Sequence, residues 1–292
     1  MPKKILLQFD TGDHASSFDS VVAIDSGVDH LLTYRDVHPS AVRGLVHGAM
    51  FTRGGDDLAS TAIFIGGEDV QDAEKLLQSV CNTFFGPVRV SVMLDAGGCN
   101  TTASAAVVAA GRHVELGNAK AAVLGGTGPV GRRVAQLLAG EGADVVLTSR
   151  SQERAEAACE DIRVKVGADQ ASTATLTAAA PRGENELKKV MADRNCVIAC
   201  GAAGVQLLSA QVVESMSDLA VAIDLNAVPP AGIEGVSMTD KAVPVGGGVG
   251  YGAIGVGGLK MRTHVQAIER LFTANDLVLD AEEIYEIAKT VG

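Results

Sequence analysis

The glycine-rich stretch at residues 121–131, AAVLGGTGPVG, constrains the fold of this chain more than any other feature. Its first four residues are apolar, as in a short buried strand, and the residues after the last glycine continue with helical periodicity. In such a strand–turn–helix unit, Gly126 permits the tight turn, Gly128 lets the backbone approach a pyrophosphate, and Gly131 lets the helix pack close to the strand. Because a second strand is expected at the right distance, the pattern favours a dinucleotide site, and an ordinary tight turn is the alternative.

The turn and the start of the helix are the expected phosphate-binding elements. The first N–H groups of a helix have no partner within it, and the positive end of the helix dipole attracts anions. We therefore predict cofactor contacts along the whole turn, at Gly126, Thr127, Gly128, Pro129, Val130 and Gly131.

The end of the second strand, at residues 144–148, indicates which dinucleotide binds. A site that prefers NAD usually has a carboxylate there, about 20 residues beyond the glycines, which binds the ribose 2′-hydroxyl. Hydroxyl and guanidinium groups stand here instead and suit a 2′-phosphate: Ser149, Arg150, Ser151 and Arg154. NADP is the predicted cofactor, and NAD stays possible if Arg150 is only a solvated surface charge.

Composition narrows the class of protein. With 292 residues the chain has room for two domains, and a formal charge of −11 argues against nucleic acid or an anionic membrane as the main partner. No apolar run reaches membrane length, and the N-terminus has the pattern of a first strand and not of a secretory signal. The five cysteines form no C-x-x-C pair and no zinc-like spacing with histidine. We expect reduced thiols, a cytoplasmic protein and no metal site.

Strand and helix patterns alternate over the first hundred residues. Strands are expected at 3–9, 30–34, 61–66 and 89–94, and helices at 18–26, 39–50 and 70–84. This succession implies a parallel sheet with helices on its faces. It contains no dinucleotide fingerprint, so this part is expected to hold the substrate.

The rest of the chain continues the alternation. Strands are expected at 121–124, 144–148, 171–175, 196–199 and 219–224, and helices at 101–114, 130–139, 152–166, 184–192, 209–216, 259–272 and 280–289. The sequence therefore predicts an α/β protein of two domains with a cleft between them. Residues 1–115 and 273–292 are expected to form a substrate domain, and residues 116–272 a Rossmann dinucleotide domain.

Three more loops are expected at the nucleotide edge of the second sheet. Small residues fill the loop at 200–204, a proline pair stiffens the loop at 224–232, and glycine alternates with apolar residues at 246–258. We interpret the third as an ordered loop whose backbone lies against a flat ligand. Cofactor contacts are predicted from these loops at Ala202, Ala203, Asn226 and Ile254. For the loop at 200–204 a plain turn is equally possible.

Short stretches along the whole chain carry a family resemblance: LQFD at 7–10, FTRGG at 51–55, STAIFIGG at 60–67, FFGP at 84–87, NTT at 100–102, GTGPVG at 126–131, NAVPP at 226–230, GVGGLK at 255–260 and DAEEIY at 280–285. With these stretches the chain resembles the NAD(P)-dependent methylene-tetrahydromethanopterin dehydrogenases of methylotrophic and related bacteria. The resemblance implies that the pterin binds in the cleft between the domains and that the protein is a homo-oligomer built from trimers. It also implies hydride transfer from methylene-tetrahydromethanopterin to NADP in one-carbon (formaldehyde) oxidation.

In the resembling enzymes a lysine at the position of Lys260 lies at the pterin site, so the resemblance implies that this lysine anchors the substrate. We expect Lys260 to start a helix, where a merely solvated lysine would be disfavoured by the helix dipole. Further substrate-binding candidates are Phe18, Asp19, Asp95, Asn100 and Thr102. For Asp19, Asp95 and Asn100 a helix cap or turn role is equally open.

Three other functions stay open. A methylene-tetrahydrofolate dehydrogenase would act on a similar reduced pterin, and a shikimate-type NADP dehydrogenase shares the two-domain layout. A protein that senses NADPH without turnover would need only the nucleotide site.

Overall fold

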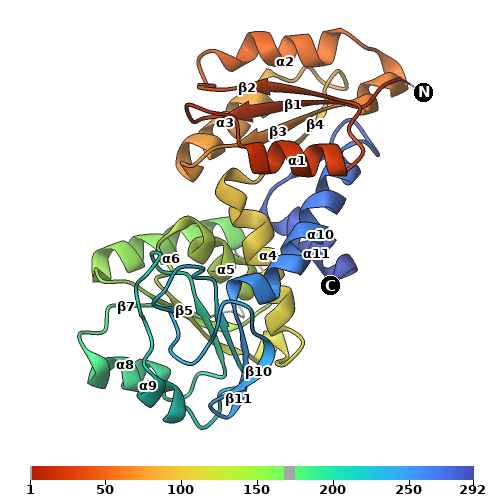
Figure 1. Ribbon diagram of the computed structural model, residues 1–292. Coiled ribbons are helices and arrows are strands. Elements are labelled where there is room, and N and C mark those ends of the chain that lie inside the picture. The colour runs from red at the N-terminus through yellow and green to blue at the C-terminus, as the bar shows by residue number, and fades with distance from the viewer. Residues whose placement is uncertain (1, 168–174) are drawn as a thin grey trace. The chain divides into compact units, whose positions relative to one another are not determined.

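The computed structural model describes residues 2–167 and 175–292, which fold into two compact units (Figure 1). Unit 1 comprises Met1–Thr101 and Met261–Val291, and unit 2 comprises Thr102–Lys260 and Gly292. The chain passes from one unit to the other inside two helices, α4 (Cys99–Ala110) and α10 (Ala253–Leu271). The boundaries therefore lie earlier in the chain than the expected ones after residues 115 and 272. Each helix is continuous, so its pattern gave no sign of a boundary.

Unit 1 contains a five-stranded parallel sheet in the order β12-β4-β3-β1-β2. Its strands are β1 (Ile5–Asp10), β2 (His30–Tyr34), β3 (Thr61–Gly66), β4 (Ser91–Leu94) and β12 (Val278–Leu279). The short strand β12 pairs with β4, so a strand from the C-terminal segment of the chain joins the sheet that the N-terminal segment forms.

Helices cover both faces of this sheet, because its buried strands are apolar on both sides. One face packs its alternate residues Leu6, Phe64 and Met93 against α1 (Ser17–Asp25), α11 (Ala281–Val291) and the last turns of α10. The helices α2 (Val42–Phe51) and α3 (Val70–Thr83) contact each other and β3. Two 3₁₀ turns, η1 (Gly55–Ser60) and η2 (Ala96–Gly98), complete the unit.

Unit 2 contains a seven-stranded sheet in the order β10-β11-β9-β8-β5-β6-β7. Its strands are β5 (Lys120–Leu124), β6 (Asp144–Thr148), β7 (Leu176–Ala179), β8 (Cys196–Ala199), β9 (Val221–Asp224), β10 (Lys241–Val245) and β11 (Gly248–Tyr251). All pairs are parallel except β10–β11. From β7 to β11 the order is that of a Rossmann fold, whose strand order reverses beside β5. The predicted α/β class with a Rossmann domain is confirmed.

Among the described residues, the helices that lie wholly in unit 2 are α5 (Pro129–Gly140), α6 (Gln152–Val166), α8 (Glu184–Met191) and α9 (Ala210–Glu214), with the 3₁₀ turn η3 (Leu116–Asn118). Leu124, Val197 and Ala222 pack with residues of α8 and α9 in one apolar core. Within the part of the chain described, no helix is long and apolar enough to cross a membrane.

Two segments of unit 2 do not match the expected elements. The strand expected at 171–175 falls mostly on residues 171–174, which lie outside the described residues, and β7 follows directly after it. The interpretation of residues 246–258 as one loop is wrong, because the segment contains β11 and the start of α10. Several of its glycines meet protein backbone: a Cβ on Gly248 would lie 2.5 Å from the Ala220 carbonyl oxygen, and one on Gly255 would collide with Asp240.

Candidate functional site

The strand–turn–helix of the glycine stretch forms as predicted, but the tight turn is made by Gly125 and not by Gly126. Gly125 has φ 67°, and a Cβ there would lie 2.7 Å from the Cα of Gly201. A Cβ on Gly126 would lie 2.6 Å from Cγ of Leu147, and one on Gly131 would lie 2.6 Å from the Cα of Gly126. Gly125 therefore makes the tight turn that was expected of Gly126, whereas Gly126 and Gly131 allow close packing behind it.

Gly128 is the residue of this turn that faces open space. It is the N-cap of α5 with an ordinary φ of −77°, and Pro129 occupies the first turn of the helix. The nearest atom to a Cβ on Gly128 would be the Gly125 carbonyl oxygen, 4.0 Å away. No side chain caps the helix, so its first N–H groups are available to an anion.

A cavity of about 1050 Å³ opens beside this turn. Predicted residues that line it are Thr127, Gly128, Pro129, Ser149, Arg150, Ser151, Arg154 and Ala202. Lining residues that the sequence reasoning missed are Leu124, Gly125, Thr148, Pro181, Gly183, Glu184, Leu187, Cys200, Gly201, Val205, Gln206, Leu207, Leu208 and Ser209. The predicted residues Gly126, Val130, Gly131, Ala203, Asn226 and Ile254 are not among those that line it.

Two arginines bring positive charge to the wall of this cavity. Arg150 and Arg154 line it together with Ser149 and Ser151. Ser151 caps α6: its Oγ accepts the N–H of Arg154 at 3.2 Å and donates to Glu153 at 2.6 Å. That hydrogen bond lowers the pKa of Glu153. Since the serine hydroxyl is engaged, the guanidinium groups are the better candidates to bind a 2′-phosphate.

The remaining predicted cofactor residues have other surroundings. Ile254 is 57% exposed on the first turn of α10. The Asn226 side chain donates to the Pro230 carbonyl oxygen at 2.9 Å and accepts the N–H groups of Val228 at 3.0 Å and Gly204 at 3.4 Å. Asn226 thus joins two loops next to the cavity, and its direct contact with a cofactor stays a prediction.

The thiols of unit 2 are poorly suited to nucleophilic chemistry. Burial raises the pKa of Cys196 to about 12. Burial, reinforced by the Asp224 carboxylate, raises the pKa of the Cys200 thiol far above its ordinary value. Because the thiolate is the reactive form, Cys200 lines the cavity as a small apolar group.

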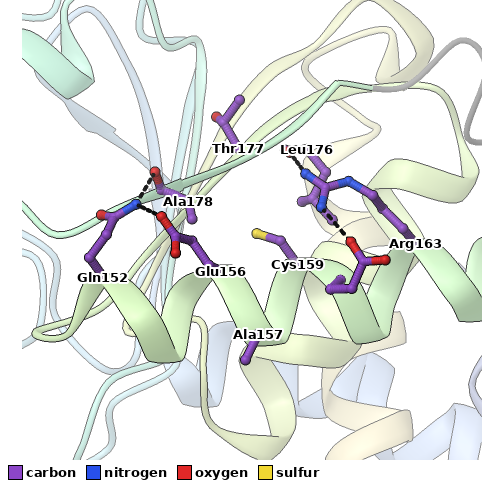
Figure 2. Close-up of a pocket in the computed structure, with 9 residues that line it drawn as sticks. Gln152, Glu156, Ala157, Cys159, Arg163, Leu176, Thr177 and Ala178 are labelled. Atoms are coloured by element: carbon purple, nitrogen blue, oxygen red, sulfur yellow. Dashed lines mark hydrogen bonds and ion pairs between the residues drawn. The ribbon is translucent and has the colours of Figure 1, made fainter.

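A second, shallower hollow of about 590 Å³ lies between α6 and β7 (Figure 2). Its polar groups are already joined: Gln152 donates to Glu156 at 2.9 Å, and Arg163 donates to Glu160 at 3.1 Å. Burial raises the pKa of the one thiol there, Cys159. The hollow therefore offers no reactive group. Among the described residues, no cluster of His, Cys, Asp or Glu could hold a metal ion.

In unit 1, two of the substrate candidates hold the start of α4. Asp95 is fully buried, and its carboxylate accepts the N–H groups of Asn100 at 2.9 Å and Thr101 at 3.1 Å and the Thr101 hydroxyl at 2.6 Å. The Asn100 amide donates to the Leu94 carbonyl oxygen at 2.7 Å and to Asp280 at 2.9 Å. Asp95 therefore has the cap role that was an open alternative, and the substrate role of both residues stays a prediction.

Phe18 and Asp19 lie at the start of α1, beside the carboxyl ends of β1 and β3. A Cβ on Gly66 would lie 3.3 Å from Oδ2 of Asp10 and 3.5 Å from Oδ2 of Asp19. Asp19 is nearly buried, whereas Phe18 is 48% exposed. The strand order of this sheet reverses between β1 and β3, which is where ligands bind in open α/β sheets. Asp19 thus lies near this point of the sheet, and the substrate contacts of Phe18 and Asp19 stay a prediction.

Lys260 is a half-buried residue in the interior of α10, and Thr102 is a half-buried residue of α4. The expectation that Lys260 starts a helix is wrong, because α10 begins at Ala253. The alternating glycines concealed the two preceding turns, since glycine disfavours helices. The dipole argument against a solvated lysine therefore no longer applies, and the role of Lys260 depends on the family resemblance alone.

Comparison with known proteins supplies the family. A model of the methylene-tetrahydromethanopterin dehydrogenase N-terminal domain matches residues 17–97, and one of the NAD-dependent epimerase/dehydratase family matches residues 121–228. Among solved structures, quinate dehydrogenase from Corynebacterium glutamicum in complex with NAD aligns with a TM-score of 0.54 at 15% identity, over 98% of each chain. At this identity the alignment is evidence for a similar fold and not for a similar function.

Two proteins of Methylorubrum extorquens match all of this chain over their own full length. "Bifunctional protein MdtA" is 44% identical over 298 residues, with 100% of each chain covered. "NAD(P)-dependent methylenetetrahydromethanopterin dehydrogenase" is 32% identical over 302 residues, again with 100% of each chain covered. The chain belongs to the methylene-tetrahydromethanopterin dehydrogenase family of oxidoreductases.

Proposed function

We propose that this protein oxidises methylene-tetrahydromethanopterin with NADP⁺ to methenyl-tetrahydromethanopterin, as a cytoplasmic enzyme of one-carbon (formaldehyde) oxidation. The observation that carries the proposal is the cavity of unit 2, which combines a helix N-terminus without a side-chain cap with two arginines. Such a site fits a dinucleotide with a 2′-phosphate. The full-length likeness to a named dehydrogenase supports the pterin substrate.

The residues that line the cavity fit both phosphate groups of the cofactor. The first N–H groups of α5 beside Gly128 would hold the pyrophosphate, and Arg150 and Arg154 the 2′-phosphate. When bound, NADP⁺ supplies the hydride acceptor. The pterin nitrogens can expel hydride without loss of a proton, so the protein needs no general base. Its contribution is to bind and orient both molecules and to exclude water.

Turnover with two pterins and two nucleotides tests this proposal. Reduced nicotinamide is followed by its absorbance with methylene-tetrahydromethanopterin or methylene-tetrahydrofolate, and with NADP⁺ or NAD⁺. We expect the fastest turnover with the methanopterin and NADP⁺. Binding of NADPH without turnover of either pterin would favour a sensing protein. Turnover of a shikimate-like hydroxy acid would favour the shikimate-type dehydrogenase.

The nucleotide preference is expected to depend on Arg150. Loss of a charge-assisted hydrogen bond costs about 1.5–3 kcal/mol, so Arg150→Ala should raise the KM for NADP⁺ roughly tenfold to a hundredfold. The KM for NAD⁺ should change little, because NAD⁺ has no 2′-phosphate. Steady-state kinetics with both nucleotides measure the two values. Equal losses would contradict the assignment.

The assembly is a separate proposal that follows from the family resemblance: a homo-oligomer built from trimers. Light scattering of the purified protein tests it, and a monomer at working concentration would exclude it.

A further inference from the structure

The carboxylate at the end of β9 holds a loop that lies next to the nucleotide cavity. Asp224 is 2% exposed. Its Oδ2 accepts the N–H groups of Gly232 at 2.7 Å and Ile233 at 3.1 Å, and its Oδ1 accepts the N–H of Asn226 at 3.0 Å. One side chain therefore fixes both ends of the segment 225–232. A Cβ on Gly232 would lie 2.7 Å from Oδ1 of Asp224, so the fit requires glycine there.

The far end of this loop holds one part of the cavity wall. The carbonyl oxygen of Gly232 accepts the N–H groups of Leu207 at 2.8 Å and Leu208 at 3.0 Å. Leu208 also forms a parallel bridge with Ile233. Both leucines line the nucleotide cavity, whereas no residue of the segment 225–232 does.

The near end of the loop holds another part of the wall. Asn226, whose N–H is bound by Asp224, accepts the N–H of Gly204 at 3.4 Å. Gly204 ends the turn that begins with Cys200, Gly201 and Ala202, which all line the cavity. Asp224 is thus connected through two routes to the start and the end of the wall at residues 200–208.

We propose that Asp224 is a positioning residue for the cavity wall at residues 200–208 and thereby for the bound dinucleotide. The inference rests on the nucleotide role of this cavity in the proposed function. An aspartate is required because both of its oxygens accept hydrogen bonds. The isosteric asparagine replaces one of these oxygens by an NH₂ group, which cannot accept a hydrogen bond. If it replaces Oδ1, the N–H of Asn226 loses its acceptor, and if it replaces Oδ2, the N–H groups of Gly232 and Ile233 lose theirs.

Asp224→Asn tests the proposal, with NADPH binding followed by the fluorescence of the nucleotide. We expect the Kd for NADPH to rise about tenfold to a hundredfold, the scale of one buried unsatisfied donor. At saturating NADP⁺, the KM for the methylene-pterin should stay within about twofold, since none of the residues expected to contact the pterin is altered.

Asp144→Asn is the matched control. Asp144 is the first residue of β6, so it lies at the amino ends of the parallel strands, whereas Asp224 lies at their carboxyl ends. Its carboxylate pairs with Arg194 at 3.0 Å. Its amide variant should lower the melting temperature of unit 2 and leave the Kd for NADPH unchanged. An unchanged Kd in Asp224→Asn, or an equal rise in both variants, would overturn the proposal.

Asn226→Ala covers the case in which Asp224→Asn does not fold. It removes the side-chain bonds to Gly204, Val228 and Pro230 and keeps the backbone bond to Asp224. Only the bond to Gly204 reaches the cavity wall, so the Kd should rise by about fivefold, within the range of one ordinary hydrogen bond. A Kd equal to that of the wild type would contradict the proposal. Failure of the wild type to oxidise the pterin while it still binds NADPH would refute the proposed function and leave this inference intact.

Discussion

Replacement of Gly128 by valine is expected to weaken NADP binding strongly and leave the protein folded. The φ of Gly128 is −77°, which valine adopts without strain, and a Cβ there meets only the Gly125 carbonyl oxygen at 4.0 Å. In the complex the same side chain would occupy the space of the pyrophosphate. Overpacking costs of about 1–3 kcal/mol predict that affinity falls on the order of 100-fold.

Thermal unfolding with and without NADP⁺ measures this effect. A ligand at about 100 times its Kd stabilises a protein by about 2.7 kcal/mol, so the wild type should melt at a higher temperature with NADP⁺. Gly128→Val should have the melting temperature of the wild type without NADP⁺ and almost no increase with it. Gly44→Val, at an exposed helical glycine with nothing within 4 Å, is the control and should keep the increase. A normal increase in Gly128→Val would refute the phosphate site.

The elements that could be predicted from the sequence are those with strong local signals. The strands His30–Tyr34, Thr61–Gly66 and Asp144–Thr148 have the predicted bounds, because apolar, β-branched runs end at turn residues. The strands β10 and β11 were missed for the opposite reason. Glycine and Pro244 weaken any strand pattern. A Cβ would meet neighbouring backbone at Gly248 and the side chains of Val236 and Val245 at Gly250, so the folded chain leaves little space for larger residues there. That requirement arises only in the folded chain.

The same distinction applies to the candidate site. Residues of the glycine turn and the tip of β6 were found, because the chemistry of a dinucleotide site is local there. Pro181 and Glu184 line the cavity because β7 pairs with β6, which no local pattern indicates. Asp224 was missed because an aspartate at the end of a strand looks like an ordinary turn residue. Its three N–H partners are up to nine positions away in the chain.

Replacement of Lys260 by alanine is expected to lower kcat strongly and leave the Kd for NADP⁺ almost unchanged. If this lysine orients the pterin, an error of about 1 Å in the position of the reacting carbon can cost on the order of 100-fold in rate. Stopped-flow turnover at saturating NADP⁺ measures kcat, and a fluorescence titration with NADPH measures nucleotide binding. Lys241→Ala, at an exposed lysine of the edge strand β10, is the control and should have normal turnover.

The pH dependence of the rate separates orientation from base catalysis. A general base would lose activity toward low pH as it becomes protonated. Hydride transfer from a methylene-pterin removes no proton, so no such loss is expected from Lys260. An ammonium about 4 Å from the developing cation would cost about 4 kcal/mol at an effective dielectric constant of about 20, so we expect it at the carbonyl edge of the pterin instead. Lys260→Arg, which keeps the charge, should therefore recover part of the rate. An alanine variant with normal turnover, or an arginine variant no better than alanine, would exclude the orienting role.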